Sequence, residues 1–315
     1  MTKLPLKILF FGTPPFAAEI LAYLIAQGVQ VVAVVTKPDR PKGRSGTPVP
    51  TPVKEVALRH NIPVYQPPLV SDPAFAPTLQ AYEADLFIVA AYGEILKQHL
   101  LDMPKKGCIN VHPSLLPKYR GATPIQSSIL AGDTETGVTI MHMAKKMDAG
   151  DIIDVVKMPI GPDTTYGELE SALCKAGSEA LLKVLHTIAN NTATRTPQDP
   201  ALATFSTKIE LENCEIHWEN ASQAIHNLIR GVNPEPGAWC YVTVKGQKLR
   251  LKVFTSKLEH NQSGKPGEIL HYGKGGMVIA TGQGAIRLLQ VQLEGKKAMS
   301  SEELSRGILK EQFHL

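Results

Sequence analysis

Short runs of β-branched and apolar residues alternate with stretches of helical periodicity through the first two thirds of the 315-residue chain. This alternation is typical of a mostly parallel sheet with helices on both faces. Four runs predict strands of that sheet, at residues 7–11, 31–36, 85–91 and 107–112. Apolar residues at helical spacing over 16–25 predict a helix, and Gly28 is a natural residue to end it. The chain is therefore predicted to begin as a doubly wound α/β fold.

The same pattern continues to about residue 189. Residues 137–143 and 152–158 are further strand candidates, expected to pair through a turn at 145–150. Thr165 and Glu168 have the spacing of a capping box, which predicts the start of an amphipathic helix. This helix is expected to close a first domain at residues 1–189.

The segment after that helix has a different composition. Residues 190–204 are polar, contain two prolines and lack periodicity, so residues 190–206 are predicted to be a linker. A helix is expected next at 221–229, followed by several short strands with glycine turns, at 239–244, 248–254, 267–270, 277–280 and 285–291. Short strands at this spacing indicate a small C-terminal β-barrel of the OB type, occupying residues 207–315.

Composition narrows the class of protein. With 43% hydrophobic and 20% charged residues the chain is globular in character, and its formal net charge of +4 permits an acidic partner without requiring one. None of the four cysteines forms a CxxC spacing, so neither a zinc cluster nor a disulfide framework is expected. No charged leader and no apolar run of membrane-spanning length is present. We expect a cytoplasmic protein with no membrane partner.

The turn after the first predicted strand excludes two kinds of cofactor. It contains Gly12, Thr13 and two prolines, whereas a dinucleotide-binding turn needs three glycines and a P-loop needs a Gly-Lys-Ser/Thr sequence. A nicotinamide or ATP cofactor is therefore not expected. Gly12 and Thr13 are explained equally well by a tight turn with a helix cap.

Asn110 and His112 stand two residues apart at the carboxyl end of a predicted strand. Side chains alternate along a strand, so both should point to one face, at the rim where α/β proteins bind ligands. An amide N–H can stabilise an oxyanion, and an imidazole can move protons near neutral pH, which together suit acyl transfer. The alternative for His112 alone is a buried, hydrogen-bonded core histidine.

Two further segments accompany this pair. Pro113 and Pro117 are expected to stop the strand and to hold an irregular loop whose backbone groups could bind a flat polar ring. Asp148 lies on the predicted turn between two strands, where an aspartate is usually only a turn residue.

Taken together, these segments resemble a known family. The chain contains the run Asn110-x-His112-Pro-Ser-Leu-Leu-Pro-x-Tyr-Arg-Gly121 and later Met147-Asp-x-Gly-Asp151. This combination is similar to the formyltransferases that use 10-formyltetrahydrofolate as formyl donor. The resemblance implies that Asn110, His112 and Asp148 are catalytic and that the folate is bound by the loop of Ser114, Leu115, Leu116 and Pro117. Because the sequence contains no cluster of metal ligands, no metal is expected.

Three other segments resemble the members of that family that formylate methionyl initiator tRNA: residues 11–17, the insertion at 37–54, and the end of the C-terminal domain at 295–299. The resemblance implies that the acceptor is the amino group of this aminoacyl-tRNA, and we expect a monomer. One departure is Ser45-Gly-Thr-Pro48, where the family often carries more lysine. The alternatives are the same chemistry with a small amine or water as acceptor, and a non-catalytic RNA-binding protein of the same fold.

Two basic segments could contact the RNA. The insertion contains Lys37, Arg40, Lys42 and Arg44 and only one acid up to residue 54. Phosphate contacts from such a loop would be salt-dependent, although a solvated loop has the same composition.

The second basic segment lies in the C-terminal domain, where Lys248, Arg250 and Lys252 alternate with apolar residues. A strand there would bury one face and present three cations on the other. The alternative is an ordinary edge strand protected by lysines.

Overall fold

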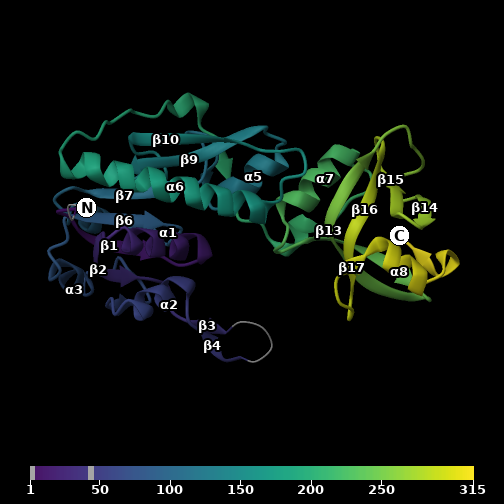
Figure 1. Cartoon of the computed structure of the whole chain (residues 1–315), viewed down its shortest axis with the longest axis horizontal. Helices are drawn as coiled ribbons and strands as arrows, with labels where there is room; N and C mark the ends of the chain where they lie inside the picture. Colours follow the sequence, from purple (N-terminus) through teal and green to yellow (C-terminus); the bar gives the residue numbers. More distant parts are fainter. Residues whose placement is uncertain (1–3, 42–45) are drawn as a thin grey trace. The chain divides into compact units, whose positions relative to one another are not determined.

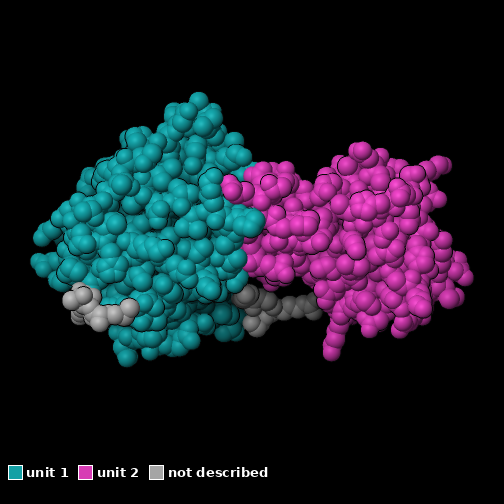
Figure 2. Space-filling model, turned by 45° about the horizontal axis from the view of Figure 1, so that its top comes forward, with its two compact units in different colours: residues 1–124, 136–159, 170–206 teal, residues 125–135, 160–169, 207–315 magenta. Residues whose placement is uncertain are grey.

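The structure is a computed structural model that describes residues 4–41 and 46–315. It contains two compact units, coloured separately in Figure 2. The N-terminal unit comprises Met1–Pro124, Thr136–Pro159 and Glu170–Ser206, and the C-terminal unit comprises Ile125–Glu135, Ile160–Leu169 and Thr207–Leu315. Two short segments that precede residue 170 in the chain therefore belong to the C-terminal unit.

A seven-stranded sheet forms the centre of the N-terminal unit (Figure 1), in the order β10-β9-β7-β6-β1-β2-β5. Strands β7, β6, β1, β2 and β5 are parallel, and β9 runs antiparallel to β7. Residues Ile8–Phe11 of the central strand are fully buried, as expected for a strand covered on both faces. The predicted doubly wound, mostly parallel sheet is confirmed. Its strands are β1 (Lys7–Gly12), β2 (Gln30–Val35), β5 (Val64–Tyr65), β6 (Leu86–Ala90), β7 (Cys108–His112), β9 (Glu135–His142) and β10 (Ile152–Pro159).

Helices cover this sheet, and their ends follow local sequence signals. α1 ends just before Gly28, whose φ of +76° closes the helix in the left-handed conformation. α6 begins with the predicted capping box, because Thr165 N donates to Glu168 Oε2 at 2.9 Å. α6 lies over β7 and β9 (Figure 1), where Gly177 faces Val111 and Val138. The helices of this unit are α1 (Pro15–Ala26), α2 (Pro52–Arg59), α3 (Ala76–Gln80), α4 (Gln98–Leu101) and α6 (Tyr166–Ala189).

The C-terminal unit is built on a curled antiparallel sheet in the order β14-β15-β16-β13-β12-β18, with β17 beside β16. Its core includes Trp239, Leu251 and Ile286. The predicted OB-like sheet is confirmed, but the strand expected at 267–270 begins two residues later, because Gly267 forms a turn with φ +83°. The elements are α5 (Pro124–Leu130), α7 (Ser222–Gly231), β12 (Ala238–Val244), β13 (Gln247–Glu259), β14 (Ile269–Gly273), β15 (Gly276–Ala280), β16 (Ala285–Leu293), β17 (Met299–Ser300), α8 (Ser301–Gly307) and β18 (Phe313–His314).

Residues 190–206, which we expected to be a linker, run along the N-terminal unit. Thr196 forms a backbone bridge with Ile152, and β11 (Phe205–Ser206) pairs in parallel with β8 (Arg120–Gly121). These contacts bring the segment next to the predicted catalytic residues.

Candidate active site

Strand β7 presents Asn110 and His112 on one face of the sheet. Ile109 and Val111 point to the other face and are almost completely buried. Because the side chains of a strand alternate, Asn110 and His112 share the face away from α6. His112 itself is buried, with 4% of its surface exposed. The burial of an ionisable ring at a strand end is a mark of a functional site as well as of a core histidine.

Asp148 reaches this pair from the turn between β9 and β10. Its Oδ1 accepts a 3.5 Å hydrogen bond from Asn110 Nδ2, and its Oδ2 lies 3.7 Å from His112 Nδ1. Oδ2 also accepts a 2.8 Å hydrogen bond from the backbone N–H of Gly121. Three residues separated by up to 38 positions in the chain therefore meet, and we call Asn110, His112 and Asp148 the Asp148 cluster.

The protonation of His112 follows from its second contact. Its Nε2 lies 3.0 Å from the carbonyl oxygen of Tyr119. A carbonyl oxygen can only accept, so Nε2 carries the proton and Nδ1 of the neutral ring is unprotonated. Burial lowers the pKa of His112 below its usual value, and the Asp148 carboxylate opposes part of that effect. In this tautomer the unprotonated Nδ1 faces the carboxyl group of Asp148.

The loop that supplies Tyr119 and Gly121 has an uncommon backbone. Tyr119 has φ +57° and Gly121 has φ +118°. A Cβ atom on Gly121 would lie 2.3 Å from the carbonyl oxygen of Ser206, so only glycine fits at this position. This close approach lets the Gly121 N–H reach Asp148.

Gln198 contacts the turn that carries Asp148 and also the buried Arg120, and it comes from the segment expected to be a linker. Its Nε2 donates to the carbonyl oxygens of Asp148 at 2.9 Å and Gly150 at 2.8 Å. Its Oε1 accepts from Arg120 Nη2 at 2.7 Å and from Nε at 3.2 Å. Arg120 is buried, with 2% of its surface exposed. No sequence signal identifies Gln198, because it lies in a polar, proline-containing stretch without periodicity.

The loop of Ser114, Leu115, Leu116 and Pro117 follows β7 directly. Ser114 Oγ donates to Lys118 O at 2.7 Å, and Thr139 Oγ1 donates to Ser114 O at 2.7 Å. Thr139 Oγ1 also accepts from Leu116 N at 3.2 Å. The loop is therefore fixed by its own backbone and by one buried threonine of β9, a residue that sequence analysis did not identify.

The predicted RNA-contacting residues of the insertion are only partly described by the structure. Lys42 and Arg44 lie outside the described residues. Arg40 is exposed in β3 (Arg40–Pro41), which pairs in antiparallel fashion with β4 (Pro48–Val49). Lys37 is partly buried, forms an ion pair with Glu94 and lies 5.5 Å from the ring centroid of Tyr92.

Lys248, Arg250 and Lys252 stand on one face of β13, opposite the buried Leu251 and Val253. We call these three basic residues the cationic face. Aromatic rings of β12 support it: Lys248 Nζ lies 4.0 Å from the Tyr241 ring and the Arg250 guanidinium 4.4 Å from the Trp239 ring. Cations held over aromatic rings have restricted side chains, so less entropy is lost when they bind a phosphate.

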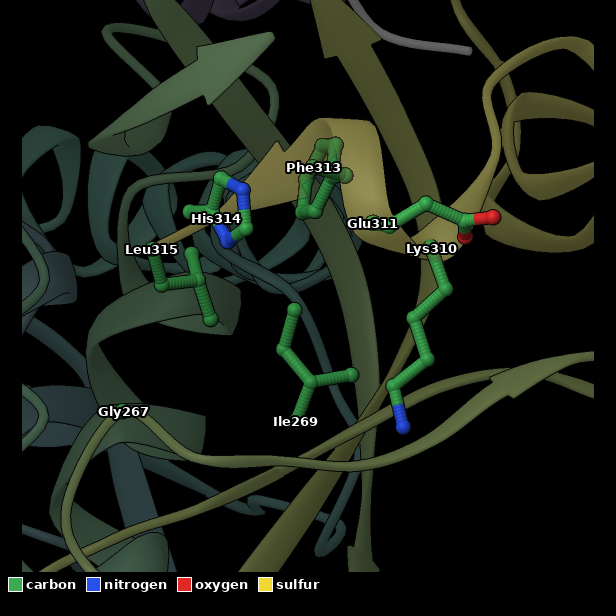
Figure 3. A pocket seen from close by; sticks show the side chains of 7 residues that line it. All are labelled: Gly267, Ile269, Lys310, Glu311, Phe313, His314 and Leu315. Carbon is green, nitrogen blue, oxygen red and sulfur yellow. The ribbon is translucent and has the colours of Figure 1, made fainter.

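Two cavities of the C-terminal unit contain no residue of either predicted site. One, of about 490 Å³, is lined by Ile269, Lys310, Phe313 and Leu315 among others (Figure 3). The other, of about 360 Å³, lies beside His226 and Arg230. Among the described residues, no group of three His, Cys, Asp or Glu side chains could hold a metal ion, and no helix combines the length and apolar character needed to cross a membrane.

Comparisons with known proteins agree with the sequence motifs. Residues 6–185 match the Formyl transferase family, and residues 208–309 match the Formyl transferase C-terminal domain. The chain is 57% identical to the methionyl-tRNA formyltransferase of Protochlamydia amoebophila over 99% of this chain and 98% of that protein. It is 46% identical to the enzyme of the same name from Chlamydia abortus, over 96% of this chain and 95% of that protein.

Solved structures share the fold at lower identity. HypX from Aquifex aeolicus, in complex with tetrahydrofolic acid, has a TM-score of 0.65 and 18% identity, covering 97% of this chain and 48% of that chain. An N-formyltransferase from Helicobacter canadensis, in complex with folinic acid and dTDP-3-aminofucose, has a TM-score of 0.63 and 22% identity, covering 90% and 98%. The family predicted from the motifs is confirmed: this chain belongs to the formyl transferase family, with both its N-terminal and its C-terminal domain.

Proposed function

We propose that the protein transfers the formyl group of 10-formyltetrahydrofolate to the amino group of methionyl initiator tRNA, giving N-formylmethionyl-tRNA for translation initiation. The observation that carries the proposal is the approach of Asn110 Nδ2 and His112 Nδ1 to one carboxylate, that of Asp148. An amide donor, a neutral base and a carboxylate at one point of a sheet rim are the groups that acyl transfer to an amine requires.

In this mechanism the neutral amine attacks the formyl carbon, and a tetrahedral intermediate forms and collapses as the folate N10 leaves. Asn110 donates its amide N–H to the developing oxyanion. Its present hydrogen bond to Asp148, at 3.5 Å, is long, so the N–H group can turn to a substrate oxygen at small energetic cost. Because the amine attacks directly, no covalent enzyme intermediate is required.

His112 and Asp148 divide the proton transfer. His112 Nδ1 takes the proton that the attacking amine releases, since this nitrogen is unprotonated while Nε2 donates to Tyr119 O. The resulting imidazolium is stabilised by the Asp148 carboxylate, whose Oδ2 lies 3.7 Å from Nδ1. The proton then passes to the leaving nitrogen N10, directly or through a water molecule.

The formyl donor and the formyl acceptor are assigned from different observations. The donor rests on the loop Ser114–Pro117 beside the cluster and on the folate compounds bound by two proteins of the same fold. The acceptor rests on the names of the relatives that are 46% to 57% identical over almost the whole chain. The cationic face, together with Lys37, Arg40, Lys42 and Arg44 of the insertion, would bind RNA phosphates. We propose a cytoplasmic, monomeric enzyme.

One assay tests the proposal. Purified protein is incubated with 10-formyltetrahydrofolate and either methionyl initiator tRNA or small amines, and the products are separated. Formation of N-formylmethionyl-tRNA is the expected result. Formylated small amines as the main product, or free formate alone, would assign another acceptor, and the absence of any product would favour a non-catalytic RNA-binding protein.

A further inference from the structure

We infer that Gln198 is a positioning residue that holds the Asp148 turn at the distance from Gly121 and His112 that the reaction needs. The inference rests on the proposed function, in which Asp148 is part of the proton-transfer machinery. The Gln198 amide bonds Arg120 and the backbone of Asp148 and Gly150, and not Asn110 or His112. It would act through the Asp148 backbone.

The backbone of Asp148 needs such support. Its φ of +50° lies in the left-handed region, which aspartate and asparagine adopt more readily than other non-glycine residues but which still costs free energy that surrounding contacts offset. The Gln198 amide supplies two of these contacts, by donating both N–H bonds to the carbonyl oxygens of Asp148 and Gly150. The turn is also tightly packed, because a Cβ atom on Gly150 would lie 1.8 Å from His142 O.

The oxygen of the same amide contacts β8, the strand whose Gly121 binds the Asp148 carboxylate. Gln198 Oε1 accepts two hydrogen bonds from the buried Arg120, and the next residue, Gly121, donates its N–H to Asp148 Oδ2. The Gln198 side chain therefore connects the turn that carries the Asp148 carboxylate with the strand, β8, whose backbone binds that carboxylate. In the stretch 194–200 only the Gln198 side chain is partly buried, and the other six residues are exposed.

The first test removes the hydrogen bonds of the Gln198 side chain and keeps its approximate volume. Gln198→Met should lower kcat by about 10- to 100-fold, the loss expected when a reacting group is misplaced by about 1 Å, with KM for both substrates within twofold of wild type. Gln198→Glu keeps the acceptor toward Arg120 but loses both donors toward the turn, so it should also be impaired. Wild-type kcat in Gln198→Glu would overturn the role of the donors, and wild-type kcat in Gln198→Met would overturn the inference altogether.

A double-mutant cycle separates positioning from a general structural effect. If Gln198 acts through Asp148, Gln198→Met should cost little or nothing further in an Asp148→Asn background. Equal losses in both backgrounds would overturn the inference, because they would show that Gln198 acts elsewhere. The product assay on the wild-type protein tests the proposed function itself. In the cycle, an Asp148→Asn variant with wild-type activity would remove Asp148 from the mechanism and this inference with it, whereas an inactive Asp148→Asn with a fully active Gln198→Met removes only the present inference.

The matched control is Gln290→Met, the same substitution at an exposed position of β16. It should leave kcat unchanged. Thermal midpoints of all variants, measured with kcat at one temperature well below them, show whether loss of activity is loss of fold. If Gln198→Met does not fold, Gln198→Glu carries the same cycle with Asp148→Asn.

Discussion

Polar side chains are buried around Asp148 in the N-terminal unit, whereas the basic side chains of β13 in the C-terminal unit stand on the surface of a regular sheet. Around Asp148, hydrogen bonds fix each group and the backbone adopts left-handed conformations at Tyr119 and Asp148. On β13, Lys248 and Arg250 lie over aromatic rings, and residues 248–252 pair with β12 in a regular antiparallel register.

From this difference we expect the two units to have different roles in the reaction. A buried group in a fixed position stabilises the charge that develops at one atom of the transition state, so its removal should lower kcat. An exposed cation contributes a small attraction that salt screens, so its removal should weaken tRNA binding and reduce the salt dependence of that binding. The four predictions below test this division, from the largest expected effect to the smallest.

The largest effect is expected at Asn110. Asn110→Ala removes the oxyanion donor and should lower kcat by about 10²- to 10³-fold, while the thermal midpoint changes little because the side chain is only partly buried. Steady-state kinetics with saturating substrates measure the loss. Asn190→Ala, at an exposed position after α6, is the control. A wild-type kcat in Asn110→Ala would show that the amide is not part of the chemistry.

Asp148 offers a test of charge against backbone conformation. Asn and Gly both tolerate the φ of +50° observed at this position, so Asp148→Asn and Asp148→Gly should each keep the turn. Both lose the carboxylate and should lower kcat by about 10²-fold. A wild-type kcat in Asp148→Asn would show that the negative charge is not needed, and the chemical role of Asp148 would be refuted.

The cationic face is predicted to affect affinity. Replacing Lys248, Arg250 and Lys252 by alanine should raise KM for tRNA and reduce the log–log salt slope of binding by about 2 to 3, since each lost phosphate contact contributes roughly 0.7 to 0.9. Saturating kcat and KM for the folate should stay unchanged. The control removes the same charge from exposed lysines of the N-terminal unit, with Lys105, Lys175 and Lys183 changed to alanine. Equal slopes in both triple variants would assign the RNA contacts to the insertion.

The smallest effect is expected on the pKa of His112. Burial lowers the folded-state pKa of His112, so an NMR titration of its ring in the wild-type protein should have a midpoint below pH 6.5. In Asp148→Asn the midpoint should be lower still, because this variant loses the carboxylate that raises the pKa. The unfolded chain binds this proton at higher pH, so the contribution of His112 makes stability fall as pH drops from 6.5 through the folded pKa. His112→Asn assigns the resonance. A midpoint at or above 6.5 would contradict the neutral base of the mechanism.

Much of the fold could be predicted from local pattern. The strands near residues 8, 33, 88 and 110 are found where β-branched runs predict them, because a strand buried on both faces needs apolar residues throughout. The capping box at Thr165 and Glu168 places the start of α6 correctly. Gly267 shows the limit of this approach: a glycine next to apolar residues was included in a strand, but its positive φ makes it part of the preceding turn.

The sequence alone also placed Asn110 and His112 on one face, because a spacing of two in a strand determines that, and its motifs identified the family. Only the tertiary structure decided that Gln198, 50 positions after Asp148, reaches the same turn, that Thr139 fixes the Ser114–Pro117 loop, and that Asp148 reaches Asn110 through a left-handed backbone. The physical reason is that periodicity reports only which residues of one helix or strand share a face. Contacts between distant segments depend on the path of the chain, and residues 190–206 reveal no such path in their composition.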